Sequence, residues 1–286
     1  MRVIAKEPGF LLFLMLLLTV GCQPRRTFDG QAAYRHVQAQ CNLGPRYPGS
    51  RGHQAVGDYI IRELQRQKCR VVTQEFDYQG VHLRNIIGKL GEGKGPLVIL
   101  GAHYDTRRFA DSDPADRNAP VLGANDGASG VAVLLELARC LDRGKLVSEL
   151  WLAFFDAEDQ GRINGWPWSV GAQYVADHLE KEPAYVIVVD MIGDAQQGIF
   201  WEHSSDRDLQ WRIWEIASQL GYREAFIPEY KYNVIDDHTP FLRKGIKAVD
   251  LIDLDYPYWH TTQDTPDKVS PESLMRVGRV LEELLK

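Results

Sequence analysis

The chain has 286 residues, of which 44% are hydrophobic, enough for one sizeable core within one or two domains. Its formal net charge of −6 excludes the basic footprint typical of nucleic-acid-binding proteins, so we expect no nucleic-acid partner.

The first 21 residues are typical of an export signal, because Arg2 and Lys6 precede a short apolar run, FLLFLMLLLTVGC, at residues 10–22. This run is too short for a comfortable membrane span. TVGC resembles a bacterial lipoprotein cleavage box, whereas an ordinary signal peptide and an uncleaved anchor are the alternatives. The resemblance implies a lipoprotein signal peptide over residues 1–21 and a lipidated Cys22 with a tether over residues 22–30. We therefore expect an exported, periplasmic protein that contacts a bacterial membrane through its lipid anchor only.

Three cysteines follow Cys22. Cys140 lies in a helical pattern and is expected to be a small buried hydrophobic residue. Cys41 and Cys69 could form a disulfide in an oxidising periplasm or remain free thiols. Their spacing resembles no cysteine metal motif.

Hydrophobic periodicity predicts helices and strands in a regular order along the chain. Two helices, over residues 30–44 and 53–67, are followed by two strands, over residues 69–78 and 82–90. Strands and helices then alternate, with strands at 96–105, 148–158, 184–193 and 246–255 and helices at 127–144, 168–181, 208–221 and 270–286. The last helix has the clearest start, because Ser270 suits the N-cap and Pro271 the first helical position.

Near-continuous apolar strands separated by helices indicate an α/β fold. We expect a mostly parallel central sheet that is flanked by helices on both faces. Residues 31–286 are interpreted as a single catalytic domain, because no linker divides them.

Polar side chains follow the predicted parallel strands at their carboxyl ends, where sites form in open α/β sheets. The set comprises His103, Asp105, Asp126, Glu158, Asp159, Asp190 and His260. Imidazole and carboxylate ligands together suit a divalent metal, and their mixture favours zinc. Side chains at i and i+2 of a strand point the same way, so Asp105 could orient a metal-bound His103.

Each of these residues also has a simpler interpretation. A strand-end aspartate is commonly a turn former or a helix cap, so Asp126 could merely cap the helix that follows it. His103 could be a core histidine, and Glu158 and Asp159 could be solvated loop charges. The convergence of these residues on one edge of the sheet nevertheless favours a functional site. In addition, the adjacent acids Glu158 and Asp159 repel each other unless a cation or a proton lies between them.

The motifs HYD, GANDGASG, FFDAEDQG, VVDMIG and WHTTQDT, in this order, resemble the zinc aminopeptidase clan. In that clan the first acid of the adjacent pair is the catalytic base and the second is a zinc ligand, which implies these roles for Glu158 and Asp159. The chain has Asp159 where many clan members have glutamate. The clan pattern also implies that His103 and Asp190 hold a second zinc ion, with Asp126 bridging the two.

A narrower resemblance extends from about Gly44 to the C-terminus. The segments PRYPGSRGH, GAHYDTR, LWLAFFDAED, DDHTPFLRKGI and YWHTTQDT are similar to the glutaminyl cyclases of the animal and bacteroidete type. Those enzymes convert N-terminal glutamine to pyroglutamate and release ammonia. The resemblance implies one zinc ion held by Asp126, Asp159 and His260, with Glu158 as the proton shuttle.

The same resemblance implies further parts of the site. Asp190 and Asp236 would form a hydrogen-bonded acid network beside Glu158, and Trp168 and Trp259 would be aromatic walls of the substrate pocket. The polar loop over residues 105–120 could contribute to substrate access or be a solvated connection.

The predicted function is therefore zinc-dependent cyclisation of the N-terminal glutamine of peptides or proteins. The alternative is a periplasmic zinc aminopeptidase, in which Glu158 would activate a zinc-bound water. A metal-dependent binding lipoprotein is a third hypothesis, against which the intact Glu158 argues. The chain has a ligand residue at each of the five zinc-binding positions of the clan pattern, which are His103, Asp126, Asp159, Asp190 and His260. The sequence therefore allows two zinc ions, although one is expected.

Overall fold

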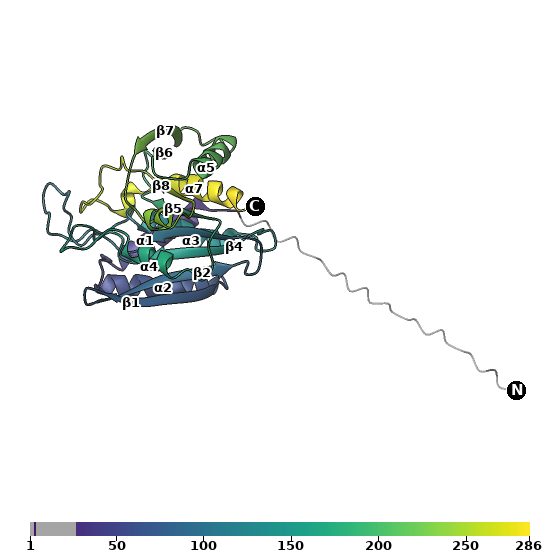
Figure 1. Cartoon of the computed structure of the whole chain (residues 1–286), viewed down its shortest axis with the longest axis horizontal. Coiled ribbons are helices and arrows are strands. Elements are labelled where there is room, and N and C mark those ends of the chain that lie inside the picture. Colours follow the sequence, from purple (N-terminus) through teal and green to yellow (C-terminus); the bar gives the residue numbers. More distant parts are fainter. Residues whose placement is uncertain (1–2, 4–26) are drawn as a thin grey trace.

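A six-stranded sheet in the order β1-β2-β4-β3-β5-β8 forms the centre of the molecule (Figure 1). The structure, a computed structural model, describes residue 3 and residues 27–286. The strands are β1 Arg70–Tyr78, β2 Val81–Leu90, β3 Leu97–His103, β4 Glu149–Phe155, β5 Tyr185–Asp190 and β8 Ala248–Ile252. Strands β4, β3, β5 and β8 are parallel, whereas β1 and β2 add an antiparallel edge. The predicted α/β fold with a mostly parallel sheet is confirmed.

Helices cover both faces of the sheet, which explains why strands such as β3 are buried along their whole length. One face packs against α1 Gly30–Asn42, α2 Arg51–Arg66, α3 Ala128–Cys140, α5 Arg207–Gln219 and α7 Pro271–Leu284. The other face packs against α4 Val170–Asp177 and α6 Thr239–Arg243. None of the helices in the described part of the chain has the length and apolarity that crossing a membrane requires.

Four short elements do not appear among the predicted ones. Strands β6 Ile199–Glu202 and β7 Phe226–Tyr232 form a separate two-stranded parallel sheet. Strand β7 contains Pro228 and is largely exposed, so it lacks the apolar pattern on which strand prediction depends. The other two elements are α6 and the 3₁₀ helix Pro266–Lys268, which are too short to produce a helical repeat.

The first and last helices of the described domain are both capped by side-chain hydrogen bonds at their N-termini. Ser270 caps α7 as predicted, since its hydroxyl accepts from the backbone N–H groups of Glu272 and Ser273. Asp29 caps α1 in the same way, and Phe28 is only 4% exposed. Residues 28–30 therefore belong to the folded domain, which corrects their assignment to the tether. Cys22 and the expected signal peptide lie outside the described residues.

The three cysteines of the described domain are buried and unpaired. Cys140 is buried in the main core, as predicted. Of the two alternatives for Cys41 and Cys69, the structure has the free thiols.

Asp156, the first of three acids after β4, has a structural role that the sequence did not indicate. Its fully buried carboxylate accepts hydrogen bonds from the backbone N–H of Arg84 and the hydroxyl of Tyr104, both at 2.7 Å. It also lies 2.7 Å from Nε2 of the buried His53. These contacts join α2 and β2 to the ends of β3 and β4.

Replacing Asp156 by alanine should lower the free energy of unfolding by about 3–5 kcal/mol, because the buried donors lose their acceptor. Equilibrium unfolding in urea, followed by circular dichroism, measures this. Asp77→Ala is the matched control, since Asp77 is 78% exposed and contacts an exposed histidine, His82. We expect it to leave the stability nearly unchanged, and equal losses in both variants would contradict the role of Asp156.

Candidate metal and catalytic centre

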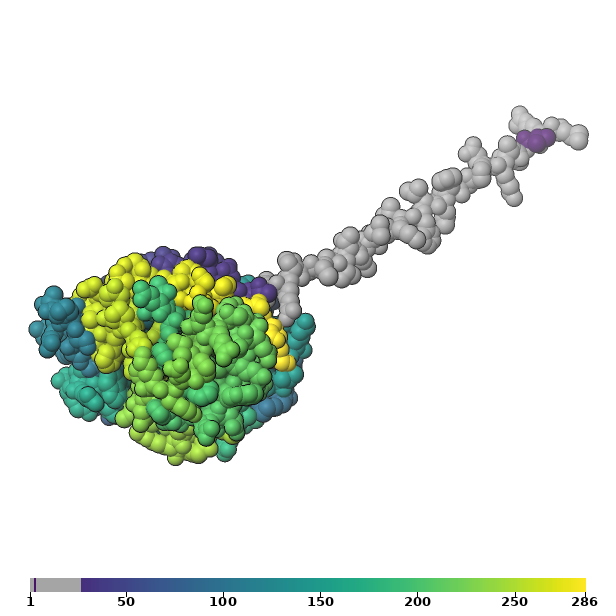
Figure 2. All heavy atoms as spheres, turned by 90° about the horizontal axis from the view of Figure 1, so that it is seen from above, coloured from purple at the N-terminus to yellow at the C-terminus, as the bar shows by residue number. Residues whose placement is uncertain are grey.

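The parallel strands end at one edge of the sheet and bring the predicted site residues together. In the β3–β4 pair His103 lies opposite Phe155, and in the β5–β8 pair Asp190 lies opposite Ile252. Glu158 and Asp159 follow β4 by a few residues, so they reach the same edge as His103 and Asp190. Figures 1 and 2 show the loop over residues 105–120 on the side of the domain opposite the C-terminal end of α7.

Two groups of buried ligand atoms share Asp126. One consists of Asp126, Asp159 and His260, and the other of His103, Asp126 and Asp190; within each group the ligand atoms lie within 4.8 Å of one another. His260 Nε2 lies 3.0 Å from Asp159 Oδ1 and 3.8 Å from Asp126 Oδ2. His103 Nε2 lies 3.1 Å from both Asp126 Oδ1 and Asp190 Oδ1. The structure therefore assembles all five residues that the sequence proposed as metal ligands.

The donor set fits a divalent cation. Both carboxylate oxygens of Asp159 are buried and have no hydrogen-bond partner within residues 27–286, which leaves them free to bind an ion. Asp126, Asp159 and His260 are each at most 3% exposed. Two carboxylates and one imidazole are the ligand types that a mononuclear zinc site uses.

Charge crowding at this centre shifts the pKa of several groups. Burial and the neighbouring Asp126 carboxylate raise the pKa of Asp159 to about 6. Burial also raises the pKa of Asp190 to about 7, against the lowering effect of His103. A bound cation would relieve this repulsion and restore the ionised carboxylates.

Glu158 lies in a cluster of buried acids. The residue is 6% exposed, and its carboxylate accepts a hydrogen bond from the Ser169 hydroxyl at 3.4 Å. Burial and the charge of Asp236 raise the pKa of Glu158 well above its usual range. Burial and Asp236 also raise the pKa of Asp237 and Asp250. Asp237 and Asp250 are thus two further buried acids close to Asp236. Asp190 Oδ1 contacts His103, and Asp236 Oδ2 has no hydrogen-bond partner within residues 27–286, so the hydrogen-bonded network of Asp190 and Asp236 stays a prediction.

Asp105 positions the loop that carries the two central acids. Its Oδ1 accepts from the backbone N–H of Glu158 at 2.9 Å, and its Oδ2 accepts from the backbone N–H of Asp159 at 3.2 Å. The amide of Gln160 donates to the same Oδ2 at 3.1 Å. Asp105 Oδ1 also lies 3.4 Å from His103 Nδ1, the contact that the sequence suggested. Its main hydrogen bonds, however, go to the Glu158–Gln160 turn.

Asp105→Ala should lower kcat by roughly 10–100-fold, the usual cost of losing a residue that supports a metal ligand. The backbone of Glu158 and Asp159 would lose the acceptor that fixes it, so kcat should fall more than KM rises. Steady-state kinetics on a peptide substrate separates the two parameters. Asp116→Asn, an exposed change in the same polar loop, is the control and should leave both unchanged. A rise in KM alone would contradict the positioning role.

Three further residues orient the ligands, and none of them was predicted from the sequence to have a role. Asp111 Oδ1 lies 3.1 Å from His260 Nδ1, so it faces the imidazole nitrogen that points away from the metal group. Asp264 accepts from the backbone N–H groups of Asn125 and Asp126 at 2.8 and 3.1 Å. Arg107 Nη1 donates to the backbone carbonyl of Asp159 at 3.2 Å. The polar loop over residues 105–120 is thus part of the site, and WHTTQDT contains the signal for Asp264.

The two predicted pocket tryptophans flank the His260 imidazole. The ring of Trp259 stacks on it at a centroid distance of 3.8 Å, and the ring of Trp168 lies at 6.2 Å in a near-parallel orientation. Trp259 is 37% exposed, so the aromatic wall reaches the surface. A cavity of about 390 Å³ is lined by residues that include Tyr78, Trp168, Ser169 and Ile235.

The backbone adopts a left-handed conformation at three positions of this centre. Ala157 has φ 54°, Met191 has φ 46° and His260 has φ 56°. Non-glycine residues adopt such values rarely, and they concentrate at functional sites. Ala157 directly precedes Glu158, Met191 directly follows Asp190, and His260 is itself one of the proposed metal ligands.

Comparisons with known proteins agree with this geometry. The model of Peptidase family M28 matches residues 85–285. The glutaminyl-peptide cyclotransferase-like protein of Bos taurus is 29% identical over 231 residues, which cover 69% of this chain and 58% of that protein. The chain thus spans little more than half of that relative's length.

Solved structures are similar over nearly their whole length. A glutaminyl cyclase of Bacteroides thetaiotaomicron bound to N-acetylhistamine has 33% sequence identity and a TM-score of 0.85, covering 91% of this chain and 98% of its own. A protein of the same bacterium described as a leucine aminopeptidase precursor has 33% identity and a TM-score of 0.86, with the same coverage. These findings confirm the resemblance read from the motifs. The chain belongs to peptidase family M28, and the proteins to which it is similar include glutaminyl cyclases.

Proposed function

We propose that this protein is a zinc-dependent enzyme that cyclises the N-terminal glutamine of peptides or proteins to pyroglutamate and releases ammonia. The observation that carries the proposal is the buried Glu158, which lies in an acid cluster beside a group of metal ligands. Relatives that are glutaminyl cyclases support the same reaction. A site for one small N-terminal residue also suits the aromatic wall that Trp168 and Trp259 form at His260.

The reaction forms a bond between the substrate α-amine nitrogen and the side-chain amide carbon, and it breaks the bond from that carbon to the amide nitrogen. One proton must move from the first nitrogen to the second, which then leaves as ammonia. A free α-amine has a pKa near ~8, so a usable neutral fraction exists around neutral pH.

Glu158 is the residue that can carry this proton. It would accept the proton from the α-amine and return it to the departing nitrogen, a contribution worth typically ~10²–10⁴-fold in rate. The neighbouring buried acids raise its affinity for the proton. Asp126, Asp159 and His260 would hold the zinc ion, which supplies Lewis-acid polarisation of a carbonyl oxygen when bound. Trp259 and Trp168 would exclude water, which would otherwise hydrolyse the substrate.

An aminopeptidase is the alternative, because the two ligand groups that share Asp126 match a two-metal arrangement. The first experiment mixes the zinc-loaded chain of residues 23–286 with a dipeptide that begins with glutamine and another that begins with leucine. Cyclisation predicts loss of one ammonia from the glutamine peptide by mass spectrometry, with the leucine peptide unchanged. Release of free leucine without ammonia would overturn the proposal and favour the peptidase.

We further propose that the protein is exported and anchored to a bacterial membrane through lipidated Cys22. The support is the sequence of residues 1–22. Expression of the full chain in a bacterium, followed by membrane fractionation, tests this. Cys22→Ser should release the protein from the membrane fraction, and a variant that stays membrane-bound would contradict the lipid anchor.

A further inference from the structure

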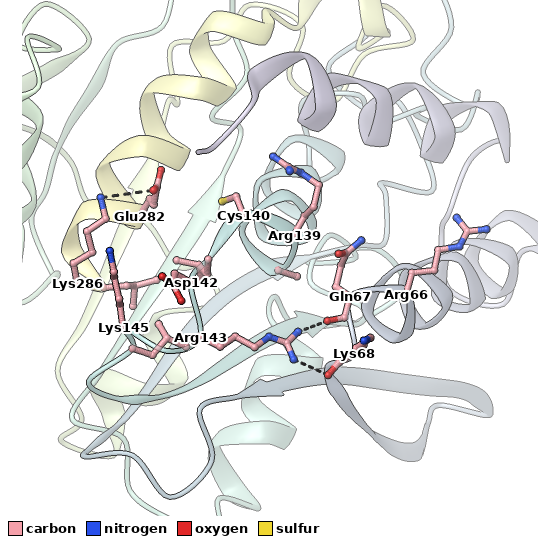
Figure 3. Close-up of a pocket in the computed structure, with 14 residues that line it drawn as sticks. Arg66, Gln67, Lys68, Arg139, Cys140, Asp142, Arg143, Lys145, Glu282 and Lys286 are labelled. Atoms are coloured by element: carbon pink, nitrogen blue, oxygen red, sulfur yellow. Dashed lines mark hydrogen bonds and ion pairs between the residues drawn. The ribbon is translucent and has the colours of Figure 1, made fainter. Parts of the chain in front are cut away.

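A large basic hollow lies at the end of the domain opposite the catalytic centre, and Figure 3 shows the residues that line it. It has a volume of about 990 Å³ and lies between the C-terminal ends of α2, α3 and α7 and the loop that leads to β4. Helix α3 begins beside Asp126 and ends at Cys140, so its length of ~20 Å separates the hollow from the catalytic centre.

The hollow is lined mainly by cations although the chain as a whole is negative. The cations that line it are Arg66, Lys68, Arg139, Arg143, Lys145 and Lys286. The acids that line it are Asp142 and Glu282, and three more glutamates, Glu63, Glu136 and Glu283, pair with cations of the hollow, which leaves a formal excess of one positive charge in a chain of net charge −6. Such a concentration of charge attracts anions and raises their local concentration.

Half of these cations have no carboxylate partner. Arg66, Arg139 and Lys286 form ion pairs with glutamates. Lys68, Arg143 and Lys145, in contrast, make no ion pair within residues 27–286. Arg143 Nη1 donates at 2.8 Å to the neutral carbonyl of Lys68, and the guanidinium also contacts the carbonyl of Gln67, as Figure 3 shows. These contacts fix the guanidinium at the hollow, while Lys68 and Lys145 are exposed.

The beginning of the described domain lies at the rim of this hollow. Arg139 Nη2 donates to the carbonyl of Thr27 at 3.1 Å, and the backbone N–H of Phe28 donates to the buried Glu282 at 3.3 Å. Cys22 precedes Thr27 by five residues, which span at most ~18 Å when fully extended. A lipid on Cys22 would therefore keep the rim of the hollow close to the bilayer surface.

We propose that Lys68, Arg143 and Lys145 bind the phosphate groups of anionic lipid headgroups in the membrane that holds the Cys22 anchor. The inference rests on the proposed anchor and departs from the expectation that the lipid is the only membrane contact. Basic residues beside a lipid anchor strengthen attachment to anionic membranes. Val147, which is 62% exposed two residues after Lys145, offers an apolar contact at the same surface.

The proposed contact has a consequence for the enzyme. It would hold the hollow against the membrane, and the catalytic centre at the opposite edge of the sheet would then face away from the bilayer. Peptides in solution would reach the centre without crossing the headgroup layer.

Co-sedimentation of residues 23–286 with lipid vesicles tests the contact without the anchor. This chain keeps the sheet, its helices and all four buried clusters, which lie within residues 28–285. We expect binding to vesicles that contain phosphatidylglycerol, little binding to pure phosphatidylcholine, and loss of binding at high salt. Lys68→Gln combined with Lys145→Gln should weaken binding roughly 30-fold, from the typical contribution of each basic residue near an anionic surface.

A matched double variant controls for the loss of charge. Lys231→Gln with Lys244→Gln removes two lysines that pair with acids elsewhere, and binding should stay at the wild-type level. Equal binding to both vesicle types, an unaffected Lys68/Lys145 variant, or binding of free glycerol phosphate without vesicle binding would overturn the proposal. Cyclisation of a glutamine peptide by both variants should equal that of the wild type, so failure of the contact is distinguishable from failure of the proposed function.

Discussion

Glu158→Gln is expected to lower kcat for cyclisation of a glutamine peptide by ~10²–10⁴-fold, the usual worth of a positioned proton-transfer group. Glutamine has nearly the shape of glutamate and can keep the contact with the Ser169 hydroxyl. It cannot take a proton from the substrate amine at neutral pH, however. The variant should therefore fold normally and retain its metal while losing the chemical step.

Two measurements separate this result from a structural defect. Zinc content per chain and the thermal unfolding midpoint should match those of the wild type. Glu215→Gln, the same change at an exposed position on α5, is the matched control and should leave kcat unchanged. A Glu158→Gln variant that keeps kcat within about tenfold of the wild type would remove Glu158 from the reaction.

The residues of this centre could be predicted from the sequence without knowing the order of the strands in the sheet. Parallel strands all end at one edge, so His103, Asp159 and Asp190 had to converge whichever strands were neighbours. The register confirms this, with the ends of β3 and β4 level and the end of β5 beside β8. The resemblance to known motifs added roles that spacing alone does not assign.

Partners that support the ligands could not be predicted in the same way. Asp111 contacts His260, which lies 149 positions further along the chain, and nothing in its polar loop distinguishes it from nearby aspartates. The three acids after β4 illustrate the same limit. Glu158 and Asp159 face the catalytic centre, whereas Asp156 turns inward to His53 and Tyr104. Only the fold shows that Asp156, among the three acids, accepts hydrogen bonds from Tyr104 and from the backbone of Arg84.

Asp159→Asn is expected to abolish zinc binding and, with it, cyclisation. Both oxygens of Asp159 lack hydrogen-bond partners within residues 27–286, so their main interaction would be with the ion. His260 Nδ1 faces Asp111, an arrangement that directs Nε2 toward the metal. Metal analysis after dialysis should give one zinc per wild-type chain and almost none for the variant. Removal of zinc from the wild type with a chelator should cause the same loss of activity, reversed by added zinc.

His103→Gln is the variant that distinguishes one zinc ion from two. His103 Nε2 forms a hydrogen bond with Asp190 at 3.1 Å, whereas both oxygens of Asp159 lack a hydrogen-bond partner within residues 27–286, so the single zinc is expected in the group that contains Asp159. We therefore expect the His103→Gln chain to keep its single zinc. Two zinc ions in the wild type and one in this variant would contradict the one-metal centre. That result would also strengthen the aminopeptidase alternative, because the second ion would then occupy the group of His103, Asp126 and Asp190.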